Sequence, residues 1–513
     1  MNKVPLYAAV AALISAAICS CTHLGDLPAD PLGSMSQVPR SSSSPYVAVD
    51  ASLSVLEGTG KGEGPSRQSG IEALGGIPSG LKGKTLSLAD CIGVALEASP
   101  DTRSTWQAVR SAAAHVGEEK SAYLPSADFS ATAARQKQVT SQSLQSGQPA
   151  ETNDFFDAAF GLSYLLFDGG QRSARVSGSL ADLQAVGFQH NAALQQVALR
   201  VEQSYYALLA ARWSLQVAEE TLHNAEYHVR LAKARFDAGL VPRSDVLKAD
   251  TEQADANLGL VSARDAVRIG EGTLASAMGL KVSTPVEIAD VPESAHPLET
   301  EDMERLLDEA SRNRPELLSA VAKVKSRESA VREAKSQYWP KLTTNAEYGW
   351  IDDAFFPTKD QWAIGFNLSF PLFTGFRRGY QVERARTDTK IATADYTSQL
   401  RGVELEVWTA YSKLIEAGEA IQAARAFVAS ADESARLAAG EYKAGTGNII
   451  ALIDAQTALT SARNRLVQAR FAWYTARAQF EKAVGRSLAA SVGLQKLDVG
   501  LDGNRHAQDD TWN

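Results

Sequence analysis

Cysteine is scarce in this sequence of 513 residues, which contains three: Cys19, Cys21 and Cys91. The first two lie at the end of an N-terminal leader, so Cys91 has no intramolecular partner and a disulfide framework is excluded. In the segment LSLADCIGVAL, we interpret Cys91 as a small buried apolar residue and not as a nucleophile or ligand. Methionine is also scarce, with four residues, which argues against a methionine ladder for monovalent copper.

An excess of positive charge is absent as well. The formal net charge is −9 at pH 7, so the sequence gives no reason to expect nucleic acid as a partner. Beyond the leader, no segment reaches the roughly 18 uninterrupted apolar residues that a membrane-spanning helix requires. If the mature protein crosses a membrane, it must therefore do so with strands.

Motifs of catalysis are missing too. Gly83-Lys84-Thr85 ends like a phosphate-binding loop, but Pro78 stands where the first glycine is required. His223 and His228 are five positions apart, which places them on different faces of a helix, and we interpret both as surface histidines. The sequence therefore predicts no enzyme, no cofactor and no metal site.

The N-terminal segment predicts export. Residues 1–20 have a lysine, an apolar stretch and small residues, the pattern of a cleaved signal peptide. The segment ICSC resembles a bacterial lipobox in which Cys21 becomes the lipidated N-terminus, and ordinary cleavage nearby is the alternative. Thr22 is not acidic, which by the same resemblance implies sorting to the outer membrane. We interpret residues 21–83 as a linker from the anchor and residues 487–513 as a polar tail.

The chain is duplicated. Residues 232–280 align without a gap on residues 438–486, 206 positions later. Repetition on this scale indicates a duplicated architecture and not a short-period solenoid. We therefore expect a first repeat over residues 84–286, a second over residues 287–486, and internal pseudo-two-fold symmetry. Upstream, Pro100 and Pro125 match Pro315 and Pro340 at an offset of 215.

Heptad repeats predict very long helices. Large apolar residues alternate with small ones every three and four positions, which is typical of helices packed side by side. One helix is expected over about 171–238, on the order of 100 Å long at 1.5 Å per residue, and its copy over about 377–444. Return helices of about half that length are expected over about 243–279 and 448–485. On the helices alone, a structural coiled coil is an equally good interpretation.

Two shorter segments complete the helical plan. A helix over about 101–123 is expected to stack on the end of the first return helix. The segment 280–310 contains three prolines and is expected to form a small mixed girdle at mid-height.

Period-two alternation predicts two antiparallel hairpins, over about 125–168 and about 341–374. Each strand has about ten residues, the length that a tilted strand needs to cross a bilayer. Four strands cannot close a barrel wide enough for a pore, and open edges are not tolerated in lipid. The barrel must then be shared between two or three copies of the chain. Aromatic residues near the strand ends suit an interfacial girdle: Phe155, Phe156, Phe167, Tyr338, Trp339, Trp350, Phe355, Phe356, Trp362 and Phe373.

In combination, these features resemble the TolC-type outer-membrane efflux protein family, in its lipoprotein branch. The resemblance covers about residues 84–486 and is carried by ALEASPDTR and RNRPELL, LLFDGGQR and PLFTGFRR, and ARFDAGLVPRSDVLKA and GEYKAGTGNIIALIDA. It implies a mostly α, α+β fold in which three copies form a 12-stranded outer-membrane barrel continuous with a periplasmic helical barrel. It also implies a periplasmic adaptor and an inner-membrane pump as partners, and outer-membrane lipid around the strands.

The resemblance places the periplasmic gate at the helical turns. Tyr442 and Asp454 match family positions in the closed aperture, and Asp245 matches a carboxylate that bridges to an arginine in some members. That arginine position is Gly447 here, and an acidic position one turn before Asp454 is Ala451, so the bridge cannot form in the same way.

Arg243 and Lys248 are the alternative partners for the Asp245 carboxylate. The simpler interpretation is that Asp245 and Lys248 are solvated charges at a helix start. Two turns are expected to dock the adaptor, because they end the longest helices and glycine exposes their backbone. They are Gly239-Leu240-Val241 and Gly445-Thr446-Gly447.

The expected function is a passive exit duct for drugs or other small toxic solutes. The duct of a type I protein-secretion system is the alternative within the family. A periplasmic coiled-coil scaffold or adaptor is the alternative of a different class, and such a protein would lack hairpins of membrane length.

Overall fold

The computed structural model describes residues 85–138, 151–290 and 301–486. The signal peptide, Cys21, the linker and the polar tail lie outside these residues. The described residues form two units, each considered by itself: residues 104–191 with 315–401, and residues 85–103 with 192–314 and 402–486. Both repeats contribute to both units.

The first unit contains one antiparallel sheet of four strands in the order β1-β2-β3-β4. The two predicted hairpins are joined in it, because β2 of the first repeat pairs with β3 of the second. One row of facing residues crosses all four strands: Phe129, Phe160, Tyr348 and Trp362. The strands are β1 (Ser126–Gln138), β2 (Glu151–Phe167), β3 (Lys341–Asp352) and β4 (Lys359–Ser369).

The register gives the sheet two chemically different faces. Side chains alternate along a strand, so residues in register with the aromatic row share one face and their neighbours share the other. The first face is apolar and carries Phe129, Phe160, Leu162, Trp362, Ile364, Phe366 and Leu368, all of them exposed. The second face carries polar and small residues, among them Asp128, Asp157, Gly161, Asn345, Glu347, Gly365 and Asn367.

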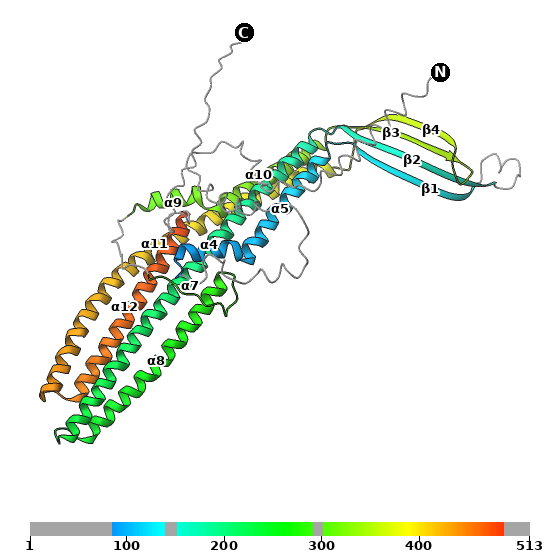
Figure 1. Cartoon of the computed structure of the whole chain (residues 1–513). Coiled ribbons are helices and arrows are strands. Elements are labelled where there is room, and N and C mark those ends of the chain that lie inside the picture. Colours follow the sequence, from blue (N-terminus) through cyan, green and yellow to red (C-terminus); the bar gives the residue numbers. More distant parts are fainter. Residues whose placement is uncertain (1–84, 139–150, 291–300, 487–513) are drawn as a thin grey trace, which may run out of the picture. The chain divides into compact units, whose positions relative to one another are not determined.

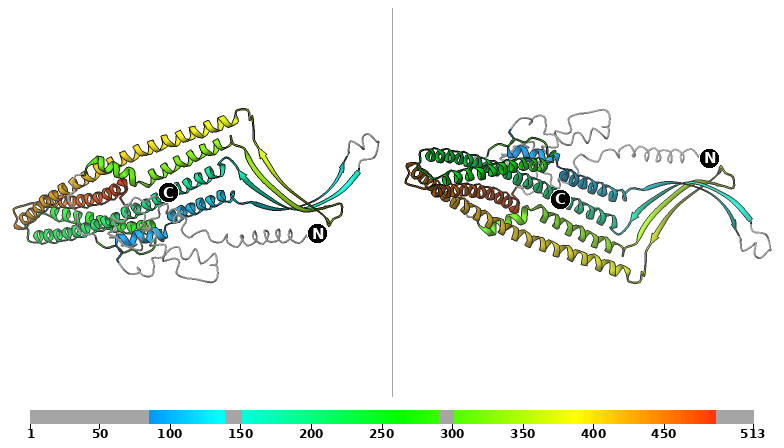
Figure 2. Two further views of the ribbon diagram at one scale, coloured as in Figure 1. Left: turned by 90° about the horizontal axis from the view of Figure 1, so that it is seen from above. Right: turned by 90° about the horizontal axis from the view of Figure 1, so that it is seen from below.

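Each strand of the first unit is continuous with one helix, and the helices lie side by side in the order of the strands (Figure 2). Val109 and Val116 of α5 pack against Leu183 of α7. Between α10 and α7, the Ser319 hydroxyl donates to the Ala185 carbonyl at 2.9 Å. These helices are α5 (Pro100–Ser121), α10 (Pro315–Ser336) and the first parts of α7 (Gln171–Asp237) and α11 (Arg377–Ala444).

The second unit is a row of long helices in the order α11, α12, α7 and α8 (Figure 1). The long helices α7 and α11 have 67 and 68 residues, as the heptads predict. The two return helices are α8 (Arg243–Ala277) and α12 (Ile449–Val484). Ala431 and Ala435 of α11 pack on Leu459 and Ala462 of α12, so small residues allow close approach of the helices.

Two short helices, α4 (Leu88–Ala98) and α9 (Met303–Asn313), belong to the same unit. Cys91 of α4 is completely buried in the largest apolar cluster, beside Tyr205 and Leu208 of α7. Burial raises the pKa of the Cys91 thiol to about 12, so the thiolate is not formed at neutral pH. The prediction that Cys91 is a buried apolar residue is confirmed. Among the described helices, none is long and apolar enough to span a membrane.

Candidate functional site

The candidate site lies at the two turns that end the long helices. After α7, Gly239 adopts a left-handed conformation with φ of 72°, and after α11, Gly445 does so with φ of 87°. Glycine is required at both positions because a left-handed backbone strains other residues. Asn448 caps the second return helix by accepting the N–H of Ala451 at 2.8 Å. Residues within each turn therefore determine its conformation.

The six residues proposed for docking lie on these turns and are mostly exposed. Leu240 is 68% exposed, a large fraction for a leucine, and a side chain at Gly239 would meet no atom within 4 Å. Gly445 and Thr446 are exposed and Gly447 is half-buried. The first turn thus presents an apolar side chain on an uncovered backbone.

Tyr442, expected in the gate, lies on the last turn of α11 and is 1% exposed. Its ring packs with Ile449 and Leu452 of α12, and Leu231 of α7 packs against the same cluster. Burial and the nearby Asp245 carboxylate raise the pKa of Tyr442, and the guanidinium of Arg235 opposes them. The turns of both repeats therefore meet at Tyr442.

Arg235 is the residue that links the two turns. It lies on the last turn of α7, donates through Nη1 to the carbonyl of Tyr442, and places its Cζ 4.7 Å from the centre of the Tyr442 ring. Sequence reasoning missed this residue. A signal was available, because Gly447 stands where the resemblance places an arginine in some members and Arg235 is the basic residue in the last turn of α7.

The other expected gate residues are more exposed to solvent than Tyr442. Asp245 is half-buried in the first turn of α8, and its carboxylate accepts from the Ser244 hydroxyl at 3.5 Å. Asp454, Arg243 and Lys248 are exposed. Within the described ranges, none of these three side chains forms an ion pair in a single copy of the chain.

His228 corrects one expectation from the sequence. It is 4% exposed, and its Nδ1 lies 3.3 Å from the Glu252 carboxylate of α8, whereas His223 is exposed. The interpretation of both residues as surface histidines is therefore wrong for His228. The reason is that His228 lies three residues after Ala225 and four before Ala232, both completely buried, so it shares the packed face of α7.

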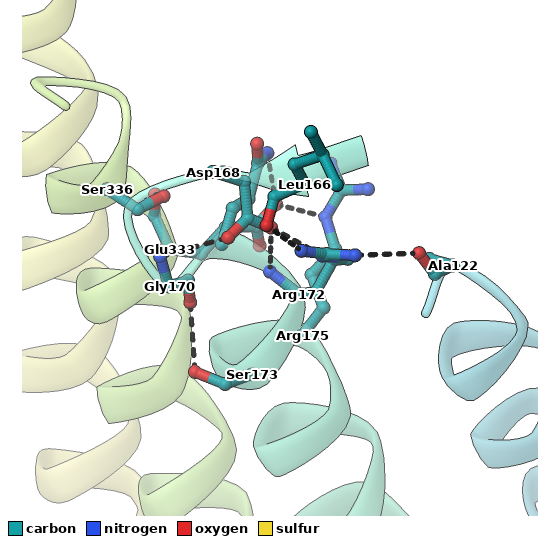
Figure 3. A network of polar contacts seen from close by, with 10 residues as sticks. Ala122, Leu166, Asp168, Gly170, Arg172, Ser173, Arg175, Glu333 and Ser336 are labelled. Atoms are coloured by element: carbon teal, nitrogen blue, oxygen red, sulfur yellow. Dashed lines mark hydrogen bonds and ion pairs between the residues drawn. The ribbon is translucent and has the colours of Figure 1, made fainter. Parts of the chain in front are cut away.

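A second group of polar contacts lies where β2 becomes α7 (Figure 3). Asp168 accepts the backbone N–H groups of Gly170 at 3.0 Å and Arg172 at 2.8 Å, and the Arg172 Nε at 3.1 Å. Burial alone raises the pKa of Asp168, but these hydrogen bonds and the charge of Arg172 outweigh it and lower the pKa. The ionised carboxylate therefore caps α7.

Arg172 joins this cap to its neighbours. Its guanidinium donates to the Ala122 carbonyl at 3.3 Å and the Leu166 carbonyl at 3.5 Å, and lies 4.8 Å from the centre of the Tyr123 ring. One turn later, Arg175 donates to Glu333 of α10 at 2.6 Å. This junction fixes the end of the strand to three helices.

Comparison with known proteins agrees with this architecture. A family model described as outer membrane efflux protein matches residues 91–280 and 306–486. The chain is 27% identical to Protein CyaE of Bordetella pertussis over 388 residues, which cover 74% of this chain and 80% of that protein. It is 25% identical to the pyoverdine export outer membrane protein OpmQ of Pseudomonas putida over 417 residues, which cover 78% of this chain and 85% of that protein.

Among solved structures, the outer membrane protein VceC of Vibrio cholerae has the same fold. The TM-score is 0.66 at 20% sequence identity, and the alignment covers 78% of this chain and 96% of that chain.

Proposed function

Because this chain belongs to the outer membrane efflux protein family, we propose that three copies form a passive channel that carries small toxic solutes out of the cell. In this proposal, the energy comes from an inner-membrane pump, and a periplasmic adaptor connects the pump to the channel. We infer that the chain is not an enzyme, since its family consists of channels.

The two-faced sheet is the observation that carries the proposal. Trp362, Ile364 and Phe366 follow one another on the apolar face of β4 with exposures of 67%, 68% and 73%. Such a face is costly in water and suits contact with hydrocarbon. The opposite face carries small and polar residues that suit a water-filled interior. On the polar face, Gln361 donates to Asp157 at 3.0 Å.

The edges of the sheet support the trimer. Within the described residues, β1 and β4 are the outer strands, and each has a hydrogen-bonding edge that no other strand covers. An uncovered edge in lipid leaves peptide groups without partners. If β4 of one copy pairs with β1 of the next, three copies close a barrel of 12 strands.

The helices have open edges as well. Leu258 of α8 is 64% exposed and Trp408 of α11 is 58% exposed, and these are the outermost helices of their row. In a ring of three subunits, α8 of one copy packs against α11 of the next and covers such residues. Each copy contributes two repeats to this ring, and we propose residues 84–286 and residues 287–486 as these repeats.

The two helical turns are proposed as the periplasmic end. In this arrangement Asp454 projects into the lumen, once per subunit, and Tyr442, Asp245, Arg243 and Lys248 surround the closed aperture. The turns at Gly239 to Val241 and Gly445 to Gly447 receive the helical hairpins of the adaptor. Lipidation of Cys21 adds an anchor in the outer membrane.

The cargo is proposed to be small. The relative OpmQ is named for export of pyoverdine, which supports a small-molecule cargo over a protein. The duct of a type I secretion system is the second candidate within the family. A periplasmic scaffold or adaptor is disfavoured by the apolar face of the sheet.

Deletion of the gene tests the proposal. We expect the deletion strain to retain more of a fluorescent efflux substrate and to become more sensitive to drugs, and the intact gene to restore both. Unchanged drug sensitivity together with loss of a protein from the culture medium would instead support protein secretion.

A further inference from the structure

We propose that Arg235 is a clamp that holds the turn of the second repeat against the first repeat and so keeps the periplasmic aperture narrow. The proposal rests on the channel function proposed above and names a residue that regulates it. Arg235 is distinct from Tyr442, Asp245, Arg243, Lys248 and Asp454, and it lies on α7 and not on the return helices.

The guanidinium of Arg235 lies at the end of a helix of the second repeat. The carbonyl of Tyr442 belongs to the last turn of α11, where carbonyl groups lack helical partners and the helix dipole is negative. It accepts from Arg235 and also from the N–H of Gly445 at 3.2 Å. A positive charge at this point stabilises the end of α11, and it is supplied by α7.

The turn after α11 fits closely around Arg235. The guanidinium lies over the ring of Tyr442, and a Cβ at Gly445 would be 3.3 Å from Nη2 of Arg235. The left-handed glycine therefore leaves the space that the guanidinium needs. One turn earlier on α7, Leu231 packs on the Tyr442 cluster, so polar and apolar contacts act together.

The two repeats differ at the position of Arg235. At the offset of 206 that relates the repeats, Arg235 corresponds to Glu441, which is exposed. The second repeat therefore has no arginine at this position that could contact the turn of the first repeat. Because the link is one-sided, neutralising Arg235 should release the turn after α11 without disturbing the turn after α7.

The test uses the purified full-length protein with Arg235→Gln and Arg235→Lys substitutions. In planar bilayers, we expect Arg235→Gln to raise the single-channel conductance severalfold and Arg235→Lys to give an intermediate value, because lysine keeps the charge but not the planar fork. Arg230→Gln is the matched control on the same helix, since Arg230 is exposed and pairs loosely with Glu226 at 4.0 Å. This control should conduct like the wild type.

A distance measurement separates this proposal from the channel function. Spin labels on cysteines introduced at the exposed residues Asp237 and Lys443 report the separation of the two turns. We expect the distance distribution to broaden and lengthen in Arg235→Gln at unchanged trimer yield. Wild-type conductance and an unchanged distribution in Arg235→Gln would overturn the clamp. If the wild-type protein formed no channel, the proposed function would fail, but the distances would still decide whether Arg235 joins the turns.

Discussion

Arg172 and Arg378 make equivalent contacts in the two repeats. Arg172 donates to the carbonyls of Ala122 and Leu166 and lies 4.8 Å from the Tyr123 ring centre. Arg378 donates to the Gln337 carbonyl at 3.2 Å and to the Leu372 carbonyl at 3.4 Å, and its Nη2 also donates to the Pro371 carbonyl. Its Cζ lies 5.0 Å from the centre of the Tyr338 ring. Each arginine thus ties a strand end to the end of the preceding helix.

Replacing Arg378 by alanine should destabilise this junction. The buried guanidinium satisfies several carbonyls, so its loss should cost about 2 kcal/mol or more of the free energy of unfolding. The temperature at which the proposed trimer dissociates on a gel measures the effect. Arg377→Ala is the matched control, because the adjacent Arg377 is exposed, and it should leave that temperature unchanged. Equal dissociation temperatures for both variants would show that the junction contributes little.

The arginine pair shows what the sequence can predict. LLFDGGQR and PLFTGFRR place the two arginines at the same offset as the rest of the duplication, so their equivalence is visible before the structure. The long helices and strands follow from heptads and period-two alternation. The pairing of β2 with β3 is not predictable from either hairpin, because it joins residues nearly two hundred positions apart.

The gate is less predictable than the fold. Tyr442 and Asp245 are expected there by resemblance, and the charge of Asp245 helps to raise the pKa of Tyr442. Arg235 was missed because its partner is 207 positions away and its own motif resembles an ordinary helix end. The sequence offers two signals, Gly447 where some family members have an arginine and Arg235 at the end of α7, but it does not show that the two turns meet.

The cap at Asp168 should depend on pH. Because its pKa in the folded protein is below the ordinary value of 3.8, the carboxylate stabilises the fold above that value. This contribution is lost as the pH falls from about 4 through the lower folded pKa. Wild-type protein should therefore melt at a higher temperature than Asp168→Asn at pH 7, and the difference should shrink at pH 3. A difference that stays constant with pH would contradict the assignment.

The turn after α7 should dock the adaptor. Gly239→Trp adds a bulky side chain to open space, so it should abolish drug efflux while leaving the trimer yield unchanged. Gly239→Ala is the control, because it introduces the same backbone strain, about 1–2 kcal/mol, without the bulk. Gly445→Trp should also abolish efflux, although it displaces Arg235 as well. Normal drug resistance in both tryptophan variants would place docking elsewhere.

Asp454 should set the ion selectivity of the aperture. In the proposed trimer, three exposed Asp454 carboxylates would surround one narrow axis and attract cations, because a lumen shielded from bulk water would screen them poorly. Asp454→Ala should therefore lose much of its cation selectivity and its block by trivalent cations added from the periplasmic side. An unchanged blocking curve in planar bilayers would remove Asp454 from the ring and leave the aperture to Arg243, Asp245 and Tyr442.

The native mass of a Cys21→Ala variant, exported with a different cleavable signal and extracted from cell membranes, tests the central claim most directly. Membrane insertion is attributed to the shared strands, and an acyl chain on Cys21 would add only further affinity. The variant should therefore be recovered from the outer membrane as a complex of three chains. Recovery as a soluble monomer in the periplasm would contradict the account.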